Sequence, residues 1–144
     1  MSFVKVWIHF VWSTKNREPL LTNSIRPKVF QHIRENAKTK EIHLDFIGGY
    51  TDHVHCLISL GSGQEIENII RLIKGESSLW VNKIKLTRGK FGWQDEYFAV
   101  SVSPSLVPGV RRYIANQEEP HSTKSFSDEF NGFMKWAGFQ RFEG

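Results

Sequence analysis

Two histidines form the first group of residues in this chain whose types and spacing suit chemistry. His53 and His55 flank Val54 in an apolar run that reads as a strand. Residues i and i+2 of a strand project to the same face, so both imidazoles can share one metal ion. His-x-His pairs also arise by chance, and two sheet-surface histidines without a metal are the alternative interpretation.

Tyr113 and Gln117 form a second pair, spaced i, i+4 in a segment that reads as a helix. Residues at this spacing share one helix face. If this helix packs on the sheet beside the histidines, the amide oxygen of Gln117 offers a third metal ligand. A half-buried tyrosine next to a solvated glutamine is the commoner situation for such a pair taken alone.

Basic side chains accompany these groups. Arg111 and Arg112 precede Tyr113 directly, and Lys15, Arg17 and Lys74 lie elsewhere in the chain. Guanidinium and ammonium groups are the usual partners of phosphate, so these five residues are candidates for DNA binding. A solvated surface is the alternative for each of them.

Composition restricts the class of protein. The 144 residues suit one domain, and a net charge of +4 is compatible with a nucleic-acid partner without requiring one. The single Cys56 excludes an internal disulfide framework and a zinc site built of several cysteines. No stretch reads as a signal peptide or a membrane span, so we expect a cytoplasmic protein.

Hydrophobic periodicity predicts the elements that position these residues. Period-two alternation predicts strands at residues 4–12, 42–47, 53–60 and 97–103, with Gly48 and Gly49 ending the second. Helical spacing predicts helices at residues 24–38, 65–85, 108–118 and 126–137. The order β-α-β-β-α-β predicts an α+β, ferredoxin-like antiparallel sheet. Two helices then cover one face, while the tyrosine-bearing helix and a final helix follow.

On this basis we expect one domain over residues 1–144. Its core runs from about residue 3 to 119, and a helical extension follows from about 120 to 144. On the third strand, Val54, Cys56 and Ile58 should face the helix-covered core, and Leu57 should share the histidine face. That second face must bind something, be covered by the later helices or pair with another subunit.

Several segments together resemble a known family. The His53-Val54-His55 motif matches the HUH signature, and the run at 113–119 looks like a catalytic tyrosine helix with its glutamine. Residues 12–17, 73–78 and 93–103 are also similar to segments of that family. The family comprises the HUH-type single-tyrosine transposases of small bacterial insertion sequences, including their repeat-associated relatives. The resemblance covers about residues 5 to 135.

The resemblance implies a mechanism. Tyr113 would attack a phosphodiester of single-stranded DNA, giving a 5′-phosphotyrosine link and a free 3′-hydroxyl that later rejoins strands. His53, His55 and Gln117 would hold Mg²⁺ or Mn²⁺. The resemblance further implies a homodimer, a DNA hairpin near the cleavage site and a tyrosine helix that acts within one subunit or across two.

One departure from the family pattern is visible. The family often continues after its glutamine with two histidines, whereas this chain has Pro120 before His121. Three alternatives stay open: a domesticated endonuclease that cuts host repeat hairpins, a related nuclease that nicks DNA for replication or plasmid transfer, and a ferredoxin-like nucleic-acid-binding module without catalysis.

Overall fold

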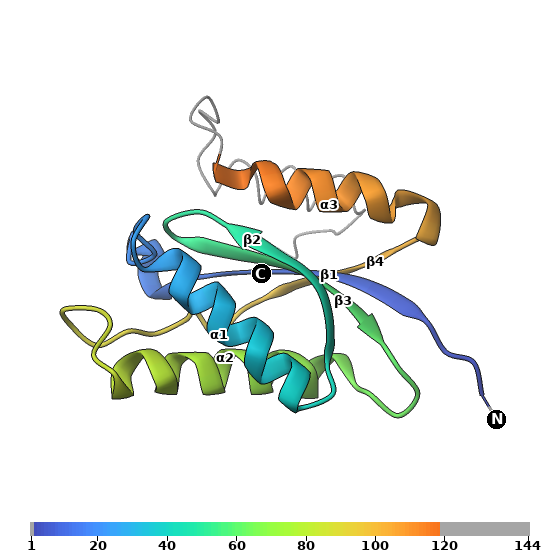
Figure 1. Cartoon of the computed structure of the whole chain (residues 1–144), viewed down its shortest axis with the longest axis horizontal. Helices are drawn as coiled ribbons and strands as arrows, with labels where there is room; N and C mark the ends of the chain where they lie inside the picture. The colour runs from blue at the N-terminus through green and yellow to red at the C-terminus, as the bar shows by residue number, and fades with distance from the viewer. Residues whose placement is uncertain (1, 119–144) are drawn as a thin grey trace, which may run out of the picture.

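A four-stranded antiparallel sheet forms the centre of the protein, as a computed structural model describes it for residues 2–118 (Figure 1). The strand order is β2-β3-β1-β4, so β1 and β3 are central. The elements in chain order are β1 (Val6–Ser13), η1 (Lys15–Arg17), α1 (Arg26–Thr39), β2 (His43–Gly49), β3 (His53–Leu60), α2 (Ile66–Lys83), β4 (Phe98–Val102), η2 (Pro104–Leu106), α3 (Val107–Ala115) and η3 (Asn116–Glu118). The predicted α+β fold with β-α-β-β-α-β order is confirmed. The helix predicted at 126–137, and Pro120, lie outside the described residues.

Helices α1 and α2 cover one face of the sheet, and their apolar stripes meet the alternating apolar residues of the strands (Figure 1). Val29, Ile33 and Ala37 recur at i, i+4 along α1 and are all buried. The predicted core residues of β3 join the same cluster: Val54, Cys56 and Ile58. Full burial of one such large apolar side chain contributes about 1.5–3 kcal/mol, so this cluster stabilises the sheet and both helices together.

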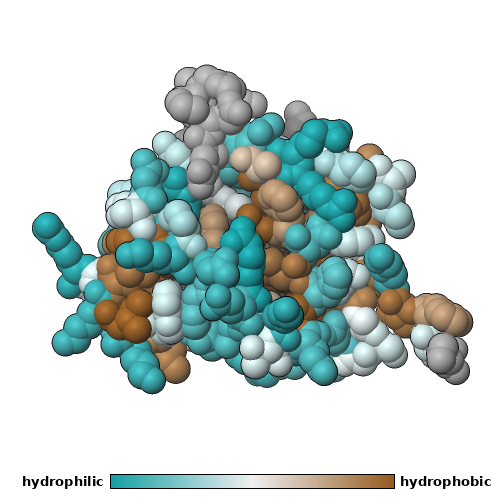
Figure 2. Space-filling model, viewed as in Figure 1, coloured by the Kyte–Doolittle hydropathy of each residue, from teal (hydrophilic) through white to brown (hydrophobic). Residues whose placement is uncertain are grey.

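Helix α3 covers the opposite face of the sheet (Figure 1). Ile114 and Val107 of α3 pack there on Leu57, Trp7 and Val102, which project from three different strands. Figure 2 shows hydrophobic residues at the junction of α3 with the sheet. Of the three options for this face, the structure therefore shows coverage by the helix that carries Tyr113.

Strand β2 corrects one prediction. Gly48 and Gly49 do not break the strand after residue 47, because both belong to β2, which pairs Gly48 with His55 and Gly49 with Val54 and ends at Gly49. The reason is a close approach: a Cβ atom on Gly48 would lie 2.6 Å from the carbonyl oxygen of Ile114. The glycine thus admits the backbone of α3 against the strand. Helix α2 is likewise continuous through Gly75.

This contact gives a first prediction. Gly48→Ala should push α3 away from β2, because the new methyl group would meet backbone atoms that cannot rotate aside. We expect faster hydrogen exchange at the amides of residues 110–115 and lower thermal stability. Gly75→Ala is the matched control, since no atom lies within 4 Å of its Cβ position in mid-helix. That control should keep or raise stability, by up to about 1 kcal/mol. Unchanged hydrogen exchange in Gly48→Ala would show that the close contact between Gly48 and Ile114 does not limit the position of α3.

None of the helices in residues 2–118 is long and apolar enough to cross a membrane.

Candidate active site

Gln117 contacts His53 across 64 residues of sequence. The amide Oε1 lies 3.0 Å from His53 Nε2, and the amide nitrogen donates to the carbonyl oxygen of Tyr113 at 3.2 Å. This second bond fixes the orientation of the amide, because it directs the NH₂ group to the helix backbone and the oxygen to the imidazole. The predicted meeting of this glutamine with the histidine strand is thus present within one chain.

Tyr113 lies against the second histidine. Its ring centroid is 5.5 Å from that of His55, in an edge-on arrangement, and the tyrosine is half-buried between α3 and the sheet. His55 has no exposed surface, and His53 is 4% exposed. All four residues predicted from spacing therefore gather at one place, where β3 and α3 pack together.

Asp52 supports His53 and was missed by sequence reasoning. Its Oδ1 lies 2.9 Å from His53 Nδ1. When the carboxylate accepts the Nδ1 hydrogen, the Nε2 lone pair can serve a cation shared with Gln117 Oε1; without a cation, the contact with that acceptor oxygen requires a hydrogen on Nε2. The available signal was an acidic residue directly before the His-Val-His motif, but adjacency in a chain does not show which way a side chain turns.

His9 is a third buried imidazole at the site and was also missed. Its Nε2 lies 2.9 Å from His55 Nδ1, and its ring centroid lies 6.2 Å from that of Tyr113. Sequence alternation places His9 on the same face of β1 as Trp7 and Val11. Only the pairing of β1 with β3, which sets Val11 opposite His55, brings the two histidines together.

The donor set fits a divalent cation with open coordination positions. Within residues 2–118, no three His, Cys, Asp or Glu side chains are arranged to hold a metal ion, so an ion bound here would need the amide of Gln117 as a ligand. Neighbouring ligands of an octahedral ion with bonds of about 2.1 Å stand about 3.0 Å apart. The separation of His53 Nε2 and Gln117 Oε1 matches this value, and it is also the length of an ordinary N–H···O hydrogen bond. Imidazole ligands favour transition metals, whereas amide and phosphate oxygens suit Mg²⁺ or Mn²⁺.

Arg111, a predicted DNA-binding residue, is engaged within the protein. Its Nε and one terminal nitrogen donate to the two carboxylate oxygens of Asp45 on β2, at 2.7 and 2.8 Å. The Arg111 hydrogen bond lowers the pKa of Asp45, against burial, with the nearby positive charges adding to the effect. This bidentate pair fastens α3 to β2. Its neighbour Arg112 is exposed.

The pair gives a second prediction, for pH dependence. A depressed carboxylate pKa stabilises the fold above the ordinary aspartate value of about 3.9, and this contribution disappears as pH falls through the lower folded value. Asp45→Asn should therefore be less stable than the unmodified protein at pH 7, and the difference should shrink below about pH 4. Thermal denaturation from pH 3 to 7 measures this. Glu35→Gln, an exposed carboxylate on α1, is the control; a difference that is constant with pH contradicts the interpretation.

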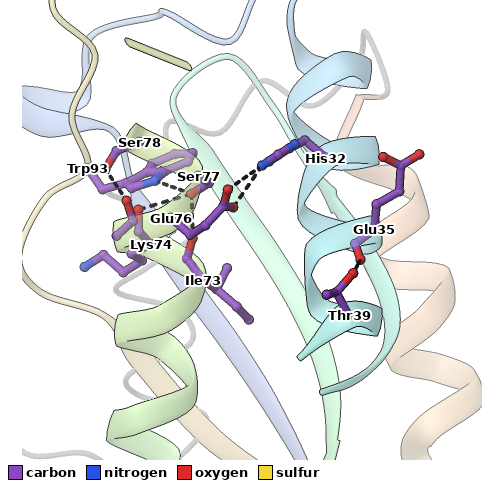
Figure 3. A network of polar contacts seen from close by, with 10 residues as sticks. His32, Glu35, Thr39, Ile73, Lys74, Glu76, Ser77, Ser78 and Trp93 are labelled. Atoms are coloured by element: carbon purple, nitrogen blue, oxygen red, sulfur yellow. Dashed lines mark hydrogen bonds and ion pairs between the residues drawn. The ribbon is translucent and has the colours of Figure 1, made fainter. Parts of the chain in front are cut away.

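Lys74 also has a structural partner. Its Nζ donates to the carbonyl oxygens of Gln94 and Asp95 at 2.5 and 3.0 Å, and burial lowers its pKa, against the charge of Asp95. Figure 3 shows Lys74 in a network with Ser77, whose hydroxyl accepts the indole N–H of Trp93 at 2.9 Å. The segment at 73–78 therefore anchors the loop before β4, and DNA binding by Lys74 stays a prediction.

Lys15 and Arg17 are exposed in η1, at the end of β1. They do not belong to the cluster around Tyr113. Their contact with DNA stays a prediction, as does that of Arg112.

Comparisons with known proteins place this fold and site in one family. The family model described as IS200-like transposase matches residues 2–117. The ISDra2 transposase TnpA of Deinococcus radiodurans is 24% identical over 116 residues, which are 77% of this chain and 83% of the relative.

Two solved structures share the fold. A protein of D. radiodurans R1 assigned as a transposase aligns with a TM-score of 0.65 and 22% identity, over 81% of this chain and 94% of its own. A REP-associated tyrosine transposase bound to a REP hairpin aligns with a TM-score of 0.62 and 16% identity, over 85% and 72%. Because the family match covers most of the sequence and every residue of the site, the chain belongs to the family of IS200-like transposases.

Proposed function

We propose that this protein cuts and rejoins single-stranded DNA through a covalent bond to Tyr113, beside a divalent cation held by His53, His55 and Gln117. The contact between His53 Nε2 and Gln117 Oε1 carries this proposal. It brings together the two halves of a motif that are 64 residues apart, so that one ion could contact both. Membership of a transposase family supports the same reaction class.

The attacking group needs activation. A free phenol has a pKa near 10, so only about one part in a thousand is phenolate at pH 7. When bound, Mg²⁺ or Mn²⁺ would polarise the scissile phosphate and neutralise its charge. The phenol of Tyr113 then gives up its proton to solvent and its oxygen forms a bond to phosphorus, and the bond from phosphorus to the 3′-oxygen breaks. That oxygen takes up a proton and becomes a free 3′-hydroxyl.

Rejoining is the reverse of the same step. The 3′-hydroxyl of a second strand attacks the phosphotyrosine, the phosphodiester forms again and the phenolate leaves. The phosphorus–oxygen bond energy is conserved in the covalent intermediate, so no high-energy cofactor is required. The role of α3 is to hold the phenol at a fixed place, because Ile114 and Val107 pack the helix onto the sheet on either side of Tyr113 in sequence.

The substrate is proposed as single-stranded DNA with a hairpin. A related fold is known with a REP hairpin bound. The exposed Arg112, Lys15 and Arg17 supply positive charge for the DNA backbone. We further propose that the protein acts as a homodimer, as the family resemblance implies, and that it works in the cytoplasm, as expected from its composition.

A gel assay tests the proposal. Strands of DNA from both flanks of the gene, labelled at either end, are incubated with the protein and Mn²⁺ or Mg²⁺ and run under denaturing conditions. We expect a covalent adduct that keeps only the 3′-side label, that is lost with a chelator and that does not form on fully paired duplex. Retention of the 5′-side label, or binding without any adduct, contradicts the proposed polarity or the proposed catalysis. Adduct formation without strand joining would instead favour the domesticated endonuclease.

A further inference from the structure

We propose that His9 is a positioning residue, which holds His55 in the one tautomer that can bind a cation through Nε2. The proposal rests on the metal site of the proposed function. His9 lies on β1, outside the His-Val-His motif and the tyrosine helix, and is joined to His55 by the 2.9 Å contact between His9 Nε2 and His55 Nδ1.

The contact fixes which nitrogen of His55 can act as a ligand. Because Nδ1 contacts His9, a cation would have to bind through Nε2. A ligand nitrogen needs its lone pair, so the hydrogen of a neutral His55 must sit on Nδ1. His9 must then accept it. If His9 donates instead, the hydrogen moves to Nε2 of His55 and blocks coordination.

Burial strengthens the dependence of the His55 tautomer on His9. His9 is 3% exposed and His55 is 0% exposed, so both rings are almost entirely shielded from solvent. Replacing His9 with an apolar residue would remove the acceptor of the Nδ1 hydrogen, at a cost typical of an unsatisfied buried donor. His55 would then be free to adopt the other tautomer or to rotate.

An imidazole suits position 9 better than a carboxylate would. Asp52 accepts from the more accessible ligand His53, whereas His9 accepts from the fully buried one. A carboxylate at position 9 would bury a second negative charge close to the point where a phosphate must approach. An imidazole supplies an acceptor without that repulsion.

The surroundings of His9 allow its imidazole to be replaced by another side chain of similar size. His9 and Tyr113 line a cavity of about 290 Å³ whose other lining residues are apolar: Val100, Val102, Leu106, Gly109 and Val110. A phenylalanine at position 9 keeps an aromatic ring in this apolar space without an acceptor. A glutamine places an amide oxygen near the position of Nε2, and so retains one.

The test uses the full-length protein and Mn²⁺ alone, without DNA. Isothermal titration calorimetry should show His9→Phe binding Mn²⁺ about 10–100-fold more weakly than the unmodified protein. His9→Gln should bind within about threefold of it, on the same basis. His43→Phe is the matched control, because His43 is an exposed histidine on β2, and it should leave the affinity unchanged. Equal affinity in His9→Phe, or an equal loss in His9→Gln, overturns the proposal.

A second measurement is independent of metal and of the variants. Nitrogen-15 NMR of the metal-free protein at pH 8 reports which nitrogen of His55 carries the hydrogen. We expect Nδ1–H, and an Nε2–H form of His55 overturns the proposal even if the variants do not fold. If the unmodified protein binds no Mn²⁺ but His55 is in the Nδ1–H form, the metal site of the proposed function fails while the hydrogen bond assigned to His9 stands.

Discussion

Tyr113→Phe should form no covalent adduct with DNA, while it still binds the same strand. The substitution removes one oxygen atom and keeps the ring that packs against His55 and on the sheet. Loss of the nucleophile in an enzyme that works by covalent catalysis lowers the rate by at least about 10⁴-fold. Adduct formation on a denaturing gel and strand binding in a native gel separate the two properties.

The other tyrosines are the controls for this result. Tyr50 and Tyr97 are 41% and 38% exposed, and each offers a phenol that solvent and DNA can reach. Tyr50→Phe and Tyr97→Phe should both keep the adduct. An adduct in Tyr113→Phe would mean that one of them is the nucleophile, and its own phenylalanine variant would then identify it.

The second large effect is expected at the cation ligands. His53→Ala and Gln117→Ala each remove one side of the 3.0 Å contact. Each should slow cleavage by about 100-fold or more, because even residues that only orient metal ligands are worth 10–100-fold. If both hold the same ion, the double variant should be little worse than either single one, since effects of groups that act as a unit do not add.

Two observations keep this test specific to the cation. His43→Ala changes an exposed histidine of β2 and should cleave at the normal rate. Raising Mn²⁺ should partly restore Gln117→Ala, which keeps both imidazoles, and should restore His53→Ala less. Additive losses, with no response to Mn²⁺, would mean that the residues shape the fold or the DNA contact rather than hold an ion.

The sequence by itself determined the parts of the site that depend on local periodicity. The i, i+2 spacing of His53 and His55 sets their common face, and the i, i+4 spacing of Tyr113 and Gln117 does the same on a helix. The strand and helix patterns also predicted the order of the strands and helices along the chain. That order in turn predicted two helices on one face of the sheet. These properties follow from backbone geometry that repeats every two or every 3.6 residues, so neighbours in the chain suffice to specify them.

Tertiary structure alone decided which partner each side chain meets. Gly48 looks like a strand breaker in sequence, yet its missing side chain is what admits the backbone of Ile114. Arg111 looks like a phosphate ligand, yet Asp45 binds it. His9 reaches His55 only through the register of β1 against β3. Contacts of this kind depend on how separate elements pack, and the free energy that fixes that packing comes from the whole core rather than from any local run of residues.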